Sequence, residues 1–194
     1  MSISSLDYYL TAVNIAGFAI SAINSRSGRK NGRISPWVAI SALLGGTPGI
    51  LAAILVFDRK ARKENMMERV FVSCLFVIQI ILLFMLKGLH REDISLDFME
   101  FFKNRRPFAI YLAAINIAAF ASFGIDKFNA AAGRFRIRIS FLLGLSFAGG
   151  AAGGLLAMYL FRHKTRKNYF TVGLPLMIVM QITVIFYLMN LKFG

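Results

Sequence analysis

The stretch "ISFLLGLSFAGGAAGGLLAMYLF" (Ile139–Phe161) carries no charged residue and has a double glycine near its centre. It is long enough to cross a bilayer, which takes about 20 residues of helix. Glycines at the middle of such a segment also favour a tight reversal, because a residue without a Cβ adopts turn conformations easily. The stretch therefore predicts either a spanning helix or a re-entrant hairpin that enters and leaves a membrane on one side.

A second stretch, "SPWVAISALLGGTPGILAAILVF" (Ser35–Phe57), has the same design. The glycines that we expect at the two turning points are Gly45, Gly46, Gly49, Gly149, Gly150, Gly153 and Gly154. The alternative is that they let spanning helices approach closely, since small residues four apart are a common contact between membrane helices.

The composition of the whole chain predicts an all-α integral membrane protein. Of its 194 residues, 57% are hydrophobic and only 16% are charged, and the mean hydropathy is +0.63. A soluble domain of this size carries more charge. The net charge of +14 resides mostly in short loops between apolar runs. Such loops are typical of the cytoplasmic side of a membrane protein, and they also suit an anionic lipid or a phosphate-bearing ligand.

The chain contains the same pattern twice. "YYLTAVNIAGFAISAIN" (Tyr8–Asn24) aligns with "IYLAAINIAAFASFGID" (Ile110–Asp126), and "GGTPGILAAILVFDRKARK" (Gly45–Lys63) aligns with "GGAAGGLLAMYLFRHKTRK" (Gly149–Lys167). We therefore predict two tandem membrane repeats of three apolar segments each, 1–87 and 108–194. The residues between them, 88–107, form an amphipathic linker that we expect along the membrane interface.

The distribution of Lys and Arg favours re-entrant middle segments. If these segments return to the side they entered from, 17 of the 23 basic residues lie on one side and 6 on the other. If they span, the division is 13 to 10, a weaker positive-inside bias. Inverted repeats have a weak bias by nature, so spanning segments stay open as the alternative. The basic loops are expected in the cytoplasm.

The second copy resembles a known family. "GIDKFNAAAGRFRI", the double glycine and "FRHKTRKN" are similar to a bacterial membrane family catalogued as a domain of unknown function, in some members fused behind a cold-shock domain. The resemblance covers residues 108–191, while residues 7–86 look like a worn second copy; Ser140 and Phe141 depart from the family's Pro-Glu. It implies a protein of the bacterial inner (cytoplasmic) membrane and no particular activity.

The loop "FRHKTRKN" (Phe161–Asn168) is the candidate anion site. If the preceding helix continues through it, His163 and Lys167 are neighbours four residues apart, as are two arginines. Arginine would grip a phosphate as a fork and lysine as a point charge. We expect Asp126, which directly follows the fourth apolar segment, to pair with Lys127 or a nearby arginine. The candidate ligands are Arg162, His163, Lys164, Arg166, Lys167 and Lys127. The alternative is a solvated loop that only orients the protein.

Four polar side chains recur inside the apolar segments: Asn14, Gln79, Asn116 and Gln181. One interpretation is that they hydrogen-bond between helices, and the other is that they line a polar path. No acidic residue lies in mid-span, which argues against a cation or proton relay on a buried carboxylate.

Sequence signatures of enzymes are missing. Two histidines and one cysteine do not make a His-rich zinc site, and no phosphate-binding loop is present. We expect no catalytic residue, metal or cofactor. The first hypothesis is a small transporter, channel or flippase-like protein with a cationic cytoplasmic mouth for an anionic solute or phospholipid. The second is a non-transporting scaffold that binds anionic lipid or acidic partners. A membrane enzyme stays open as a third and less favoured alternative. Membrane lipids are the expected partner, a homo-oligomer stays open, and nucleic acid is not expected.

Overall fold

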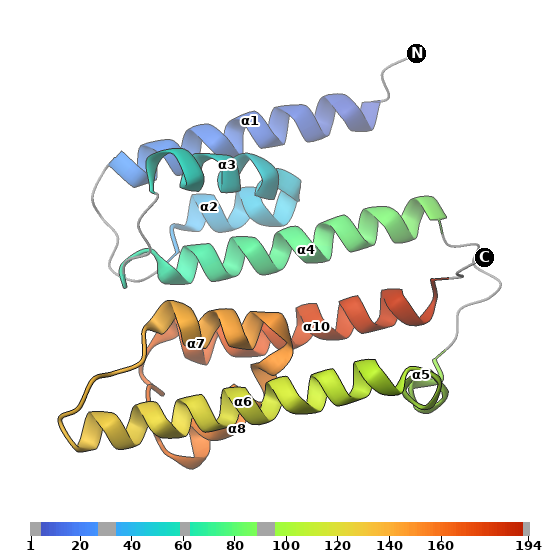
Figure 1. Cartoon of the computed structure of the whole chain (residues 1–194). Helices are drawn as coiled ribbons and strands as arrows, with labels where there is room; N and C mark the ends of the chain where they lie inside the picture. The colour runs from blue at the N-terminus through green and yellow to red at the C-terminus, as the bar shows by residue number, and fades with distance from the viewer. Residues whose placement is uncertain (1–4, 27–33, 59–62, 89–95, 192–194) are drawn as a thin grey trace. The chain divides into compact units, whose positions relative to one another are not determined.

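A computed structural model describes residues 5–26, 34–58, 63–88 and 96–191 (Figure 1). The chain divides into two compact units, Met1–Gln79 and Ile80–Gly194. Unit 1 contains α1 (Ser5–Arg26), α2 (Pro36–Ser41), the π-helical turn η1 (Ala42–Gly46) and α3 (Thr47–Phe57). The next helix, α4 (Met66–Gly88), begins in unit 1 and ends in unit 2.

Unit 2 continues with a short helix and then a long one, α5 (Phe98–Asn104) and α6 (Arg106–Ala131). A broken segment follows, made of α7 (Ile139–Leu145), the π-helical turn η3 (Ser146–Gly150) and α8 (Ala151–Leu160). The last helices are α9 (Asn168–Thr171) and α10 (Gly173–Met189). The expected linker, 88–107, lies partly outside the described residues, which omit 89–95, and its remainder contains α5.

Among the described residues, six helices are long and apolar enough to cross a membrane. They are Ser5–Arg26, Pro36–Phe57, Met66–Met85, Arg106–Ala131, Ile139–Leu160 and Asn168–Met189. This confirms the all-helical prediction and fits a multi-pass membrane protein. Two of the six, Pro36–Phe57 and Ile139–Leu160, are the glycine-centred segments and contain the two π-helical turns.

Local signals explain where α5 and α6 begin and end. The Asp97 carboxylate accepts a hydrogen bond from the Glu100 N–H and caps the first turn of α5. Pro107 lies in the first turn of α6, where its missing N–H costs nothing. Gly133 then takes a left-handed φ of 67°, and the Arg134 N–H reaches the Asn129 carbonyl. This bond closes α6 as a Schellman motif.

The middle segment of unit 2 is not a straight helix. Gly149 has a φ of 135°, which L side chains rarely adopt. The two ends of the segment meet on α6: the Ile137 N–H and the His163 ring both lie 2.9 Å from carboxylate oxygens of Asp126. A straight helix of 22 residues would hold its ends about 33 Å apart. The chain therefore folds back at Gly149, as Figure 1 shows for α7 and α8.

Unit 1 has the same break. Gly45 takes a φ of 106° inside η1. Val38 of α2 and Ile54 of α3 belong to one buried cluster, together with Val72 of α4. Residues 16 positions apart on a straight helix would be about 24 Å from each other and could not share so small a core.

Glycine is required where the returning helix touches its neighbour. A Cβ on Gly153 would overlap the backbone carbonyl of Asn116, and a Cβ on Gly49 would overlap that of Asn14. At Gly150 a Cβ would come within 2.8 Å of the Ile115 carbonyl oxygen. These contacts are with backbone atoms, which cannot rotate away. Gly45 and Gly149 thus lie at the bends, and Gly49, Gly150 and Gly153 allow neighbouring helices to approach closely.

We predict that Gly153→Ala destabilises the protein by at least about 1–3 kcal/mol, the usual cost of overpacking, because α8 must move away from α6. Gly144→Ala is the matched control, since a Cβ there meets nothing within 4 Å. Thermal unfolding in detergent compares the two. Equal unfolding temperatures for both variants would contradict the close α6–α8 contact.

Candidate functional site

The buried carboxylate of Asp126 is the centre of the candidate site. Its side chain is fully buried on α6. Three donors surround it: the Ile137 N–H at 2.9 Å, the Lys164 Nζ at 2.6 Å and the His163 Nε2 at 2.9 Å. They come from both ends of the α7–α8 segment, so one carboxylate ties the two ends together. Hydrogen-bonded partners are what permit a charge to be buried.

The expected pairing of Asp126 with Lys127 or an arginine was wrong. Lys127 follows Asp126 on the helix, and successive side chains on a helix point in different directions. Lys164 approaches instead and also lies 5.1 Å from the centre of the Phe170 ring. Burial lowers the pKa of the Lys164 ammonium and outweighs the hydrogen bond and charge of Asp126, which raise it, while the charge of Arg136 lowers it further.

The basic loop is not a continuation of α8, so the expected four-residue pairings do not form. The helix ends at Leu160. Arg162 takes a left-handed φ of 46°, its N–H bonds the Tyr159 carbonyl, and the His163 N–H bonds the Met158 carbonyl. These bonds make a Schellman motif in which arginine occupies the position usually given to glycine. The reversal turns His163 and Lys164 back toward Asp126.

The remaining cations of the loop point outward. Arg162, Arg166 and Lys167 are exposed, whereas His163 and Lys164 are partly buried against Asp126. Lys127 is partly buried at the end of α6. The structure thus separates the six predicted ligands into two that contact Asp126, three that face outward, and Lys127, which is partly buried. Only the three that face outward are available for an external anion.

Unit 1 places different residues in the corresponding region. Glu68, at the start of α4, is 2% exposed and accepts hydrogen bonds from Ser21 and Asn24 of α1, at 3.5 Å and 3.2 Å. Asn65 donates to the Asp58 carboxylate at 2.7 Å, and Arg69 donates to the Asp58 carbonyl. In unit 1 these two carboxylates, Asp58 and Glu68, lie on the loop after α3 and on α4, whereas Asp126 of unit 2 lies on α6.

The carboxamide of Asn116 forms hydrogen bonds with backbone groups at the bend in unit 2. Its Nδ2 donates to the Gly149 carbonyl at 2.9 Å, and its Oδ1 accepts from the Gly153 N–H at 2.8 Å. The Gln181 Nε2 donates to the Ser146 carbonyl at 2.7 Å. The Tyr111 hydroxyl donates to the Ala148 carbonyl at 2.6 Å. Backbone groups near the bend thus receive side-chain partners from α6 and α10.

Unit 1 contains the same four side-chain contacts at the aligned positions. The Asn14 Nδ2 donates to the Gly45 carbonyl at 3.4 Å, and its Oδ1 accepts from the Gly49 N–H at 2.8 Å. Gln79 donates to the Ala42 carbonyl at 2.6 Å, and the Tyr9 hydroxyl donates to the Leu44 carbonyl at 2.9 Å. Both bends are therefore held by an asparagine, a glutamine and a tyrosine from the neighbouring helices.

One contact at the bend of unit 1 has no equivalent in unit 2. The Thr47 hydroxyl donates to the Gln79 carboxamide oxygen at 2.5 Å. The aligned residue in the second copy is Ala151, whose side chain has no hydroxyl to donate.

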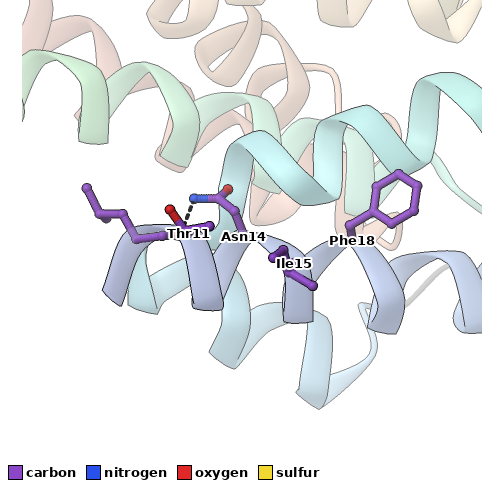
Figure 2. Close-up of a pocket in the computed structure, with 5 residues that line it drawn as sticks. Thr11, Asn14, Ile15 and Phe18 are labelled. Carbon is purple, nitrogen blue, oxygen red and sulfur yellow. Dashed lines mark hydrogen bonds between the residues drawn. The ribbon is translucent and has the colours of Figure 1, made fainter. Parts of the chain in front are cut away.

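A shallow hollow of about 450 Å³ is lined by residues of α1 (Figure 2). Its lining residues are Leu10, Thr11, Asn14, Ile15 and Phe18. Asn14 is the polar residue shared with the bend, and its Nδ2 donates to the Leu10 carbonyl at 2.8 Å (Figure 2). The Thr11 hydroxyl is likewise bonded to the Asp7 carbonyl at 2.7 Å. The lining of the hollow thus lacks the convergent charged groups that would bind an anion.

Two features of the site were missed from the sequence. The tyrosines whose hydroxyls bond at the bends, Tyr9 and Tyr111, occupy aligned positions and could have been found from the repeat. The approach of Lys164 to Asp126 joins residues 38 positions apart and depends on a loop conformation without a local sequence signal. Within the described residues no group of histidine, cysteine and acidic side chains could hold a metal ion.

Comparisons with known proteins identify the family. The sequence profile described as "Protein of unknown function (DUF1294)" matches residues 116–170. The uncharacterized protein YsdA of Bacillus subtilis (strain 168) is 40% identical over 73 residues, which are 38% of this chain and 82% of that protein. The chain belongs to the DUF1294 family. No solved structure matches it.

The DUF1294 match begins at Asn116, whose carboxamide bonds the backbone at the bend, and ends at Phe170, whose ring Lys164 contacts. It includes Asp126, the whole folded-back segment and the basic loop. The part of the chain that matches DUF1294 is therefore the part that contains the candidate site of unit 2.

We predict that Asp126→Asn destabilises the protein by about 3 kcal/mol, because removing one partner of a buried ion pair leaves the other uncompensated. Lys164→Met should cost a similar amount, and the double variant should cost much less than the sum. Asp97→Asn is the control, since asparagine caps a helix as well as aspartate does. Additive losses in thermal unfolding would show that Asp126 and Lys164 do not interact.

Proposed function

We propose that this protein is a small membrane transporter of the flippase-like or channel type, with a cationic cytoplasmic mouth for an anionic phospholipid or solute. The observation that carries the proposal is the separation of roles within the basic loop. Asp126 holds His163 and Lys164, while Arg162, Arg166 and Lys167 face outward. A loop held from inside presents its outward cations in a defined arrangement, which suits a phosphate better than mobile side chains do.

The two-fold design supports transport. We propose that the chain is a tandem duplication whose halves each contain a broken segment between longer helices. Asn14 and Gln79 in unit 1 make the same kinds of backbone contact as Asn116 and Gln181 at the aligned positions of unit 2. This similarity supports the interpretation. Paired repeats with discontinuous helices are a recurring architecture of transporters, because a broken helix can bind a substrate at membrane depth.

We further propose that both broken segments are re-entrant in a bacterial cytoplasmic membrane, with the basic loops on the cytoplasmic side. The contact of Asp126 with both ends of the α7–α8 segment supports this arrangement, as does the 17 to 6 division of basic residues. Irregular backbone survives in hydrocarbon only where protein satisfies its polar groups. The side-chain bonds at the two bends meet that requirement.

A scaffold that binds anionic lipid without transporting it is the second candidate. It is favoured by the contacts of the four carboxamides, each of which donates a hydrogen bond to a backbone carbonyl at a bend. In this role the same outward cations would recruit lipid headgroups or acidic partners to the membrane surface.

The re-entrant arrangement predicts that residues before α7 and after α8 lie on one side of the membrane. Single cysteines at Ala132 and Asn168, both exposed, should be protected from an impermeant thiol reagent in intact cells and labelled after permeabilisation. A cysteine at Met99, beyond the other end of α6, should be labelled in intact cells. All are made in a Cys74→Ser background. Different accessibility of Ala132 and Asn168 would favour a spanning segment.

The proposed ligand predicts that geometry matters at the outward arginines. Arg162→Lys and Arg166→Lys should each weaken binding of phosphatidylglycerol about fivefold, close to 1 kcal/mol, because lysine replaces a two-donor fork by a point charge. Lys167→Arg keeps the charge and supplies a fork, so it is the control and should bind at least as well. Native mass spectrometry with defined lipids measures the occupancy. Equal occupancy in all three variants would reduce the loop to an orientation signal.

The same variants separate the two functions. Proteoliposomes with fluorescent phosphatidylglycerol report movement of the lipid between leaflets. A transporter should accelerate it, and Arg162→Lys should slow it. Binding without any acceleration would favour the scaffold.

A further inference from the structure

The segment "RFRIR" (Arg134–Arg138) connects α6 to α7 and is neither helix nor turn. Its arginines alternate with apolar residues, so in an extended chain they point away from Phe135 and Ile137. All three arginines are exposed, and Phe135 is 97% exposed. Packing within the protein does not explain why the Phe135 ring is so exposed between two arginines.

The segment is held at both ends. Gly133 starts it with the left-handed turn that closes α6. At the other end the Ile137 N–H is bonded to the buried Asp126 carboxylate. The intervening residues therefore project from the end of α6 without being free to collapse onto it. Such an ordered projection loses little additional conformational entropy when it meets a surface.

Its charge suits an anionic surface. Residues 126–138 and 161–168 together contain eight lysines and arginines and one carboxylate, Asp126, which is buried. Arg136 is close enough to Lys164 for its charge to lower the pKa of that ammonium. The two loops thus form one continuous cationic region, and within it Phe135 is the most exposed large apolar side chain.

The depth of the segment follows from the length of α6. The apolar part of the helix, residues 108–125, is about 27 Å long, close to the thickness of the hydrocarbon core. Asp126 then lies at its edge, and the residues beyond it lie among the headgroups. Phe128, 66% exposed on the last turns of α6, adds a second ring at this level. Aromatic rings and long cations are the side chains that membrane interfaces favour.

We propose that residues 134–138 are an interfacial anchor for anionic phospholipid: Phe135 enters the headgroup region, and Arg134, Arg136 and Arg138 contact lipid phosphates. The anchor holds the end of α6 and the entrance of the folded-back segment at a fixed depth. It rests on the proposed placement of this end of unit 2 at a membrane surface and does not require transport.

Tryptophan fluorescence tests the anchor. Phe135→Trp is made in a Trp37→Phe background, because Trp37 is the single native tryptophan. The protein is reconstituted into vesicles of phosphatidylglycerol and phosphatidylcholine, or of phosphatidylcholine alone, with iodide on both sides. In the anionic vesicles we expect blue-shifted emission, quenching by lipids brominated on the acyl chain, and protection from iodide.

Arg134→Gln with Arg138→Gln should shift the emission to the red in anionic vesicles, with loss of quenching by brominated lipid. Both side chains are exposed and neither is among the partners of Asp126, and an unchanged unfolding temperature would confirm that the fold is kept. Strong iodide quenching without bromolipid quenching in the anionic vesicles would overturn the anchor. So would a ring that is protected only when a single-stranded oligonucleotide is added, since cations and aromatic rings can also bind nucleic acid.

Arg162→Lys and Arg166→Lys distinguish failure of the anchor from failure of the proposed function. When combined with Phe135→Trp, they should weaken lipid occupancy at the basic loop and leave the tryptophan emission unchanged. Loss of binding at the loop with an intact fluorescence response would leave the anchor standing, and the reverse result would overturn the anchor alone.

Discussion

The hydrogen bonds between one asparagine side chain and a broken helix are the constraint on which each unit depends. In unit 2 the Asn116 carboxamide donates to the Gly149 carbonyl and accepts from the Gly153 N–H. A chain cannot reverse in an apolar environment while its backbone groups lack partners, because each such group costs several kcal/mol. The carboxamide supplies a donor and an acceptor at once. It can do so only because Gly153 lets α8 reach the backbone of α6.

The reversal determines where the charges meet. Because α7 and α8 return to the same end of α6, the segments on either side of them become neighbours there. Asp126 then contacts one N–H group and the side chains of His163 and Lys164 from those segments. The sequence of the two loops offers the other cations no second carboxylate, and they face outward. A packing requirement at the bend thus creates the cationic surface at the end of the helix.

Much of this fold could be predicted from the sequence, because its signals are local or repeated. The apolar runs predict the helices, and the aligned glycines and carboxamides mark the two bends. The basic loop could not be predicted, since Arg162 and Lys164 adopt left-handed conformations that neither residue favours. With no glycine directly after Leu160, the sequence does not mark where α8 ends. At the end of α6, by contrast, Gly133 provides the local signal that Phe161–Lys167 lacks.

The most direct test of the account is the distance across the middle segment of unit 2. Spin labels at Ser140 and Arg162, both exposed, are placed in a Cys74→Ser background and measured by pulsed electron paramagnetic resonance in lipid. A segment that folds back at Gly149 predicts a distance well below the about 33 Å that 22 residues of straight helix would give. A single distribution at about 33 Å or more would contradict it and make Ile139–Leu160 a simple membrane span.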